Sequence, residues 1–279
     1  MPTIDPQTSS EILEIPDNWR QGWLKSDPFT KIFALDGIIY RHKDGRRTLQ
    51  FTHAGQSYFA KLHHGLGWRR FLRSLLRFKW PVSGAENEWR AIKLLEELKI
   101  PTTPLVAYGR RGKNPVNKQS FIITKDLINT ESLEDYCRNW RTEPPTPALK
   151  RALIRRVAEM TGAMHRLGLN HCDLYICHFL LDLDGGKTPN PKNLTLHLID
   201  LHRVRQRKKL PQRWQVKDLA ALHFSSFEIG LTSRDRLRFI ATYSQRPWRE
   251  SLKRENRLWD RVEKRAQAFY REFKRRGPR

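Results

Sequence analysis

Alternating apolar and polar positions predict a strand-rich first third of the chain. Three β-rich runs lie between Lys31 and His63, namely "KIFALDGIIYR", "RRTLQFT" and "SYFAKLH". The dipeptides Asp44-Gly45 and Ala54-Gly55 separate them and are typical of turns. Two further short strands are predicted in "PLVAYGR" and "SFIITKDL". This part of the chain should therefore form a β-sheet.

Apolar residues at helical spacing predict helices in the remaining segments. "AENEWRAIKLLEELKIP" places Trp89, Ile92 and Leu95 on one face and ends at Pro101. A long helix is expected to begin at Thr146 and Pro147, as N-cap and first-turn proline, and to stop at Gly168. Helices are also predicted in "GWRRFLRSLLRFKW", "VKDLAALHFSSF", "RDRLRFIATY" and the basic tail from Trp248. The run "FLLDLDGGKTPNPKNLTLHLID" indicates a hairpin that ends at Asp200.

Composition limits the class of protein without choosing a function. The 279 residues suit one large domain or two lobes sharing a cleft, and 38% hydrophobic residues with nine tryptophans provide a core. A net charge of +24 favours a polyanionic partner, whether nucleic acid, anionic lipid or a phosphorylated substrate.

The cysteines and the apolar runs bear on the compartment. Cys137, Cys172 and Cys177 form no disulfide framework and no C-x-x-C motif. The N-terminal stretch lacks the features of a signal peptide, and no apolar run reaches the roughly 18 residues that a spanning helix needs. We expect a cytoplasmic protein, soluble or peripherally bound.

Four candidate functional residues follow one another in the order found in kinase-type phosphotransferases. They are Lys61 in the third strand, Glu88 on the next helix, Asp173 in the loop after the long helix, and Asp200 after the hairpin. Lys61 fits the phosphate-binding lysine and Glu88 the residue that orients it, with Glu86 as the competitor. Taken alone, Lys61 is an ordinary edge-strand lysine that adds little to stability. The order of all four favours a kinase.

The segment "HCDLYICH" resembles the kinase catalytic loop H-R-D-L-x-x-x-N. Asp173 is then the base that accepts or orients the proton of the attacking hydroxyl. His178 occupies the position of the metal-binding asparagine, and Asp200 in "IDLH" that of the Mg²⁺ carboxylate. There is no G-x-G-x-x-G, so Arg46, Arg47 and Thr48 after Gly45 are the candidate phosphate cover, with Asp126 as a further nucleotide-binding candidate. No A-P-E motif follows, so a protein-kinase activation segment is not expected.

Other uses of the same residues remain open at this point. A metal hydrolase could hold Zn²⁺ or Mn²⁺ with five side chains: His171, Asp173, His178, Asp200 and His202. That hypothesis gives Lys61 and Glu88 no role. A basic nucleic-acid-binding module would explain the charge but not the acids, and it lacks a recognisable reading motif. The segment 67–80 is either a packed helix or a basic amphipathic element on an anionic membrane. Cys172 and Cys177 are expected to be small buried residues and not nucleophiles.

Nearly the whole chain resembles the lipopolysaccharide core heptose(I) kinases. The likeness is carried by "GLNHCDLYICHFLLDLD", "LIDLHR", "YFAKLHHGLGW", "PVSGAENEWRAI" and "RWQVKDLAALHFSSFEIGLTSRDRLRFIATY". It implies an α+β, two-lobed, protein-kinase-like fold. Residues 1–128, with an extension at 1–30, would form a small β-rich nucleotide-binding lobe with one main helix. Residues 129–279 would form a larger, mostly helical catalytic and substrate lobe.

The resemblance also implies an activity and its partners. ATP and Mg²⁺ would be used to phosphorylate the first heptose of the inner core at its 4-hydroxyl. Asp173 matches the catalytic aspartate, and His178 belongs to the family's own pattern. The acceptor would be inner-core lipopolysaccharide, with Kdo, heptose and lipid A, at the cytoplasmic face of the inner membrane. Acylated acyl carrier protein is implied as a stabilising partner, and nucleic acid is not expected as one.

Overall fold

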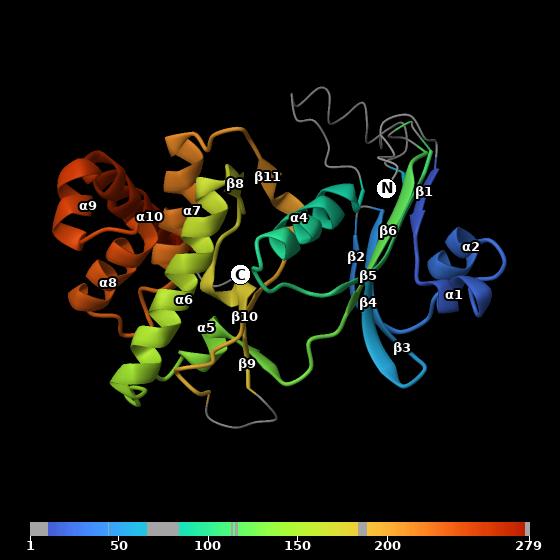
Figure 1. Ribbon diagram of the computed structural model, residues 1–279, viewed down its shortest axis with the longest axis horizontal. Coiled ribbons are helices and arrows are strands. Elements are labelled where there is room, and N and C mark those ends of the chain that lie inside the picture. Colours follow the sequence, from blue (N-terminus) through green and yellow to red (C-terminus); the bar gives the residue numbers. More distant parts are fainter. Residues whose placement is uncertain are drawn as a thin grey trace. The chain divides into compact units, whose positions relative to one another are not determined.

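The computed structural model describes residues 11–43, 45–65, 84–112, 114, 117–183 and 189–276 (Figure 1). The segment 67–80 and Asp44, both singled out above, lie outside the described residues. The chain forms two compact units. Unit 1 comprises Met1–Lys93 and Thr103–Leu127, and unit 2 comprises Leu94–Thr102 and Ile128–Arg279. The fold is α+β, as the sequence predicts.

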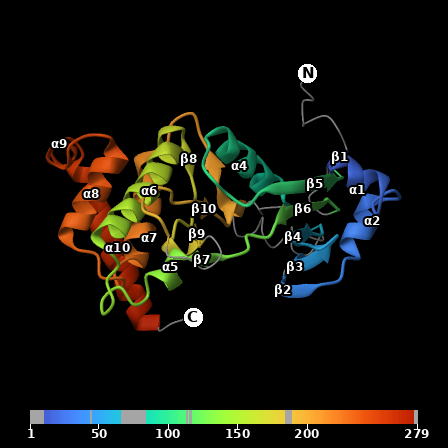
Figure 2. The same cartoon turned by 60° about the horizontal axis from the view of Figure 1, so that its bottom comes forward.

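Unit 1 is built on a six-stranded antiparallel sheet with the strand order β1-β5-β6-β4-β3-β2 (Figures 1 and 2). Its strands are β1 (Glu11–Glu14), β2 (Ile38–Lys43), β3 (Arg46–His53), β4 (Gln56–His63), β5 (Leu105–Arg111) and β6 (Gln119–Lys125). Its helices are α1 (Asp17–Gln21) and α2 (Pro28–Phe33), and α4 (Glu86–Glu97) begins in this unit. Strands β3 to β6 lie where the alternation predicts them.

The predicted strand from Lys31 is wrong before Ile38, because Lys31 to Phe33 belong to α2 and residues 34–37 connect this helix to β2. Asp27 caps this helix, accepting a hydrogen bond from Thr30 N at 3.3 Å, and Pro28 occupies its first turn. Phe29 and Ile32 lie three positions apart and are both buried. Only the second half of the run, from Ile38, is a strand.

The two faces of the sheet are covered differently. Ala60 and Leu62 of β4 belong to a buried cluster that includes Trp19 and Phe29, so α1 and α2 cover this face. Successive side chains of a strand point to opposite faces, which places Lys61 on the other one. There Trp89 of α4 stacks on Tyr108 of β5, with ring centroids 4.5 Å apart. Residues 11–30, part of the expected N-terminal extension, thus contribute Trp19, Leu24 and Phe29 to the unit's core.

Unit 2 is mostly helical, as expected. Its helices are α5 (Leu133–Tyr136), α6 (Pro147–Arg166), α7 (Gln212–Ser225), α8 (Ser233–Ser244), α9 (Trp248–Arg254) and α10 (Asn256–Arg276). Helix α6 has the predicted cap, because Thr146 Oγ1 accepts from Leu149 N at 3.3 Å. The core holds Ala158, Leu219, Tyr243 and Val262 from α6, α7, α8 and α10.

Short strands and 3-10 turns frame the loops of unit 2. The strands are β7 (Thr130–Ser132), β8 (Leu169–Asn170), β9 (Phe179–Asp182), β10 (Leu196–Leu198) and β11 (Arg205–Gln206), and the turns are η1 (Ile176–His178) and η2 (Leu201–Arg203). The predicted hairpin is the antiparallel pair β9 and β10. Gly168 has φ +75°, and a Cβ there would lie 1.8 Å from Arg207 O, so only glycine fits between α6 and β8.

Candidate active site

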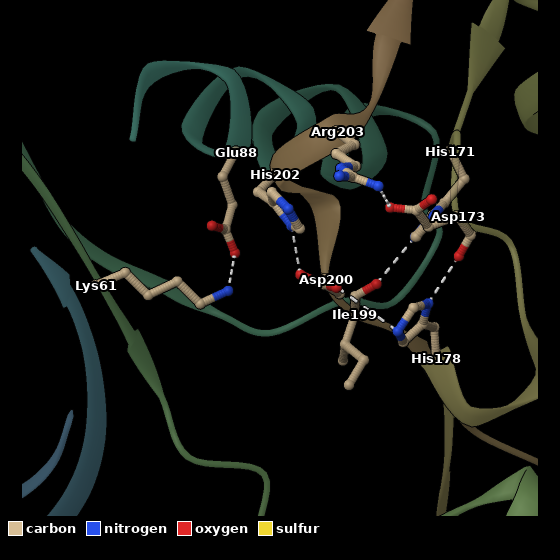
Figure 3. Close-up of polar contacts among 9 residues, drawn as sticks. All are labelled: Lys61, Glu88, His171, Asp173, His178, Ile199, Asp200, His202 and Arg203. Atoms are coloured by element: carbon tan, nitrogen blue, oxygen red, sulfur yellow. Dashed lines mark hydrogen bonds and ion pairs between the residues drawn. The ribbon is translucent and has the colours of Figure 1, made fainter. Parts of the chain in front are cut away.

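In unit 1, Lys61 pairs with Glu88. Lys61 Nζ donates to Glu88 Oε1 at 2.6 Å, and the side chains are 29% and 5% exposed, respectively (Figure 3). The competitor Glu86 is engaged by other cations, namely Arg90, Arg110 and Lys118. The contact expected between the strand lysine and the helix glutamate is therefore present, whereas the catalytic roles of both residues stay predictions.

The candidate phosphate cover divides between the two faces of the sheet. Thr48 lies opposite Lys61 in the β3–β4 ladder, so Thr48 and Arg46 share its face. Arg47 points to the other face, where its guanidinium donates to the carbonyls of Phe33 and Leu35. The structure thus separates Arg47 from the other two candidates and gives it a structural contact beside α2.

Asp126 follows β6 and is bonded to the neighbouring strands. Its Oδ2 accepts from Gln50 Nε2 at 2.7 Å and from Ser57 Oγ at 2.8 Å. Its backbone N–H also donates to Ser57 O at 3.1 Å. These bonds fasten the end of β6 to β3 and β4. Nucleotide binding by Asp126 stays a prediction.

In unit 2, the loop that carries Asp173 is held by a buried acid, Asp218 of α7. The backbone N–H of His171 donates to Asp218 Oδ2 at 2.7 Å, and that of Cys172 donates to Oδ1 at 3.0 Å. Asp218 is fully buried. Cys172 has φ +72°, a strained conformation for a residue with a side chain. The sequence predicts a helix around Asp218 but indicates no role for this residue.

A chain of hydrogen bonds supports Asp218 from behind. His165 Nε2 faces Asp218 Oδ2 at 3.4 Å and His165 Nδ1 faces Tyr243 Oη at 2.8 Å. Gln215 Nε2 donates to the same Tyr243 oxygen at 2.7 Å. Because a carboxylate only accepts, His165 donates through Nε2, and its Nδ1 accepts from the tyrosine hydroxyl. Asp218 therefore receives three donors from buried groups.

Replacing Asp218 by Asn should destabilise the protein and disorder the Asp173 loop. One carboxylate oxygen becomes an NH₂ group that faces a donor, and each buried N–H left without an acceptor costs about 1–3 kcal/mol. Urea unfolding of the variant should give a lower free energy of unfolding. Asp260→Asn, at an exposed position of α10, is the matched control. Equal stability of the two variants would show that Asp218 does not hold the loop.

Asp173 is held both through its carboxylate and through its backbone carbonyl. Its carboxylate Oδ2 accepts from Arg203 Nη1 at 2.7 Å, and its carbonyl accepts from His178 Nδ1 at 2.7 Å (Figure 3). The Asp173 side chain is 19% exposed, which leaves it accessible to a substrate. Arg203 was not identified from the sequence. Its only signal was its place three residues after Asp200.

Asp200 adopts a left-handed conformation after β10, with φ 60° and ψ 47°. His202 Nδ1 donates to Asp200 Oδ1 at 2.6 Å, and His178 Nε2 lies 3.6 Å from Asp200 Oδ2 (Figure 3). His178 donates through Nδ1 to the Asp173 carbonyl, and its Nε2 faces the Asp200 carboxylate.

His171 is a buried part of the same loop. It donates through Nε2 to Ile199 O at 3.0 Å, while its Nδ1 is buried and finds no hydrogen-bond partner among the described residues. Burial lowers the pKa of His171 below its ordinary value of 6.5. The imidazole is accordingly neutral and links the Asp173 loop to the residue before Asp200.

The lowered pKa of His171 predicts a loss of stability in mild acid. The unfolded chain binds the proton more readily, so the stabilisation is complete above pH 6.5 and falls as pH drops from there toward the folded-state pKa. The free energy of unfolding of wild type should approach that of His171→Gln between pH 7.5 and 5.5. Other buried histidines titrate in both proteins and cancel in this difference. A gap that stays constant or widens in acid contradicts the prediction.

The cysteines are thiols in this structure. Burial raises the pKa of Cys137 to about 12 and that of Cys177 to about 11, and it also raises the pKa of Cys172. Because the thiolate is the nucleophilic form, these raised pKa values lower the reactivity of the thiols at neutral pH.

The described residues contain no group of three or more His, Cys, Asp or Glu side chains that could hold a metal ion. Zinc sites use three or four such ligands, so the hydrolase hypothesis finds no support in this part of the chain. Mg²⁺ is usually held by one or two carboxylates together with substrate phosphates, and Asp200 fits that donor set. Among the helices of the described ranges, none combines the length and apolarity that crossing a membrane requires.

The family model described as lipopolysaccharide kinase (Kdo/WaaP) family matches residues 30–243. The chain is 47% identical over 266 residues to the lipopolysaccharide core heptose(I) kinase WaaP of Pseudomonas aeruginosa, covering 95% of this chain and 98% of that one. It is 44% identical over 256 residues to the protein of the same name from Escherichia coli, covering 91% and 96% of the two chains. The solved structure described as WaaP in complex with acyl carrier protein has a TM-score of 0.80 and 44% identity, and the match covers 93% of this chain and 99% of that one.

Proposed function

Because this chain belongs to the lipopolysaccharide kinase (Kdo/WaaP) family, we propose that it transfers the γ-phosphoryl group of ATP to the first heptose of the lipopolysaccharide inner core, at the 4-hydroxyl. The observation that carries the proposal is the identity of 43 to 47% with three heptose(I) kinases, along 91 to 95% of this chain. The α+β architecture and the four candidate residues support the same reaction.

Unit 1 supplies the phosphate-binding cation. Lys61 is presented by a central strand of the sheet, and the nearly buried Glu88 fixes its ammonium group at 2.6 Å. Because Glu88 already fixes the lysine side chain, contact with the nucleotide phosphates costs little further conformational entropy. Arg46 and Thr48, on the same face, are the remaining candidates for phosphate contacts.

Unit 2 supplies the acceptor chemistry. Asp173 accepts or orients the proton of the heptose hydroxyl, and Arg203 holds its carboxylate at 2.7 Å. Asp200, with His178 beside it, would hold Mg²⁺. When bound, this ion would neutralise charge on the transferring phosphoryl group. Asp218 and His171 act as positioning residues, because they fasten the backbone on which Asp173 is carried.

The direct test is an assay of purified protein with ATP and unphosphorylated inner-core lipopolysaccharide. Mass spectrometry should show one added phosphoryl group, and NMR should place it on the 4-hydroxyl of the first heptose. Acceptor that already carries this phosphate is the control and should not be modified. Phosphorylation at another hydroxyl would correct the acceptor position, and ATP turnover with protein substrates alone would favour a protein kinase.

We also propose that the chain works in the cytoplasm, at the surface of the inner membrane. Its net charge of +24 attracts it to anionic headgroups and to an acceptor that carries carboxylates and phosphates. Sedimentation with anionic vesicles, but not with neutral ones, is the expected result.

A cavity in unit 2 supports acylated acyl carrier protein as a partner. The cavity measures about 410 Å³, and its lining includes Leu153, Ile154, Leu219, Leu222 and Ile240. Apolar walls of this kind suit an acyl chain. The solved structure that this fold matches is described as a complex with acyl carrier protein.

Acylated acyl carrier protein should raise the melting temperature of this protein, and the unacylated form should not. A ligand that binds only the folded state stabilises it by mass action. Ile154→Phe and Leu219→Phe, which fill the cavity, should reduce the shift. Equal shifts with both forms would place the contact on the protein surface, and no shift with either would remove this partner.

A further inference from the structure

The segment 201–217, which joins Asp200 to Asp218, is basic and contains no acidic residue. Its cationic side chains are Arg203, Arg205, Arg207, Lys208, Lys209, Arg213 and Lys217. The segment begins beside the catalytic loop, because Arg203 pairs with Asp173 at 2.7 Å. A segment with several positive charges and no negative ones, next to the proposed base, favours the binding of an anionic group.

Three of these cations gather around one indole ring. Arg207, Arg213 and Lys217 lie 5.1, 5.4 and 5.9 Å from the centre of the Trp214 ring. No carboxylate among the described residues lies within ion-pair distance of any of the three (contrast Arg203 with Asp173). The ring attracts cations but carries no net charge, so it orders them without neutralising them. We call this group the Trp214 cluster.

The N-terminus of α7 adds a second positive feature at the same place. The helix has 14 residues and begins at Gln212 after Pro211, with no side-chain cap and no acidic residue in its first turn. The positive end of a helix dipole is ordinarily matched by an acid. Here Arg213 occupies the first turn instead. Backbone N–H groups at such an end bind carboxylates and phosphates.

The Trp214 cluster is fastened to the strand that leads into the catalytic loop. Strand β11 pairs with β8, with Arg205 opposite Asn170 (Figure 1). Arg207 donates through its guanidinium to Asn170 Oδ1 and through its backbone N–H to Gly168 O. Asn170 and Asp173 are three positions apart in the sequence, which limits the distance between their Cα atoms to about 11 Å. The residue that Arg207 contacts therefore lies within about 11 Å of Asp173, measured between Cα atoms, which is the scale of a neighbouring sugar in the acceptor.

We propose that the Trp214 cluster binds an anionic group of the acceptor, either a sugar carboxylate or a phosphate, next to the sugar that is phosphorylated. Arg213 and Lys217 are the contact residues, and Arg207 both contributes charge and positions the strand. The inference rests on the proposed function for the identity of the acceptor. It assigns specificity to a segment that lies between Asp200, the proposed Mg²⁺ ligand, and Asp218, which holds the backbone of the Asp173 loop.

The test compares two pairs of substitutions that remove the same charge. Arg213→Gln with Lys217→Gln changes the cluster, and Arg151→Gln with Arg155→Gln changes two exposed positions of α6. Binding of inner-core lipopolysaccharide is measured without ATP. The cluster pair should raise the dissociation constant tenfold or more, as expected for lost hydrogen bonds to a charged group, and the α6 pair less than about twofold. The KM for acceptor should rise likewise, with the KM for ATP unchanged.

Modified acceptors then identify the anion. If carboxyl-reduced lipopolysaccharide abolishes the difference between wild type and the cluster pair, the ligand is a sugar carboxylate. If dephosphorylated lipopolysaccharide abolishes it, the ligand is a phosphate. Equal losses in the two pairs would overturn the inference in favour of general charge attraction, and so would unchanged binding by the cluster pair. Wild type that binds the acceptor but never phosphorylates it would overturn the proposed function and leave the binding comparison valid.

Discussion

Replacing Asp173 by Asn should lower turnover by about 10²–10⁴-fold while leaving the affinity for Mg²⁺-ATP close to that of wild type. The amide keeps the size of the side chain but cannot accept the proton of the heptose hydroxyl. The variant weakens the ion pair of this side chain with Arg203, but the loop should keep its place because Asp218 and His178 hold its backbone. The loss should therefore appear in the chemical step.

Asp200→Asn should fail in a different way. Its carboxylate is the proposed Mg²⁺ ligand, so the variant should lose Mg²⁺-dependent nucleotide binding as well as turnover. Titrating ATP into both variants, with and without Mg²⁺, separates the two roles, and Asp260→Asn serves as an exposed control. Asp173 is not the base if its Asn variant binds nucleotide as poorly as Asp200→Asn, or if it still transfers phosphate at the normal rate.

Local periodicity was enough to predict most elements of the fold. Strands β3 and β4, helix α6 with its Thr146 cap, and the β9–β10 hairpin all lie where the sequence places them. One exception is α2, because a short apolar run fits either a strand or a helix, and β1 and α1 were not predicted at all. The start signals for the helix were Asp27 and Pro28, just outside the run that was read as a strand.

The parts of the site that could not be predicted depend on contacts between distant segments. Asp218 lies 46 residues after Cys172 and acts only once α7 packs against the loop, which no local pattern encodes. Arg47 and Thr48 are adjacent in sequence, yet the pleat of β3 sends them to opposite faces. Arg203 and the Trp214 cluster likewise acquire meaning only from what their side chains contact. The spacing of residues in the sequence was enough to find the candidate acids, whereas the residues that hold them are recognised only from tertiary contacts in the structure.

Removing the ammonium of Lys61 should abolish most of the activity and also weaken the fold. The sequence alone suggested little effect on stability, but Glu88 is only 5% exposed, and its second oxygen is buried with no hydrogen-bond partner in the part of the chain that the structure describes. Lys61→Met therefore leaves the buried Glu88 carboxylate without its cation. Breaking such a pair lowers the free energy of unfolding by about 3–5 kcal/mol. Low activity in this variant could then reflect unfolding and not the loss of a phosphate contact.

The double variant Lys61→Met with Glu88→Gln separates these causes. Glutamine at position 88 removes the unpaired negative charge, so the free energy of unfolding should recover toward that of wild type. Turnover should stay at least about 10²-fold below wild type, as expected for a lost phosphate-binding cation. Glu86→Gln is the matched control, because Glu86 lies on the same helix but pairs with Arg90, Arg110 and Lys118. It should keep near wild-type turnover, whereas Glu88→Gln should lower it by freeing the lysine. Recovery of both stability and turnover in the double variant would show that Lys61 serves the fold and not the phosphates.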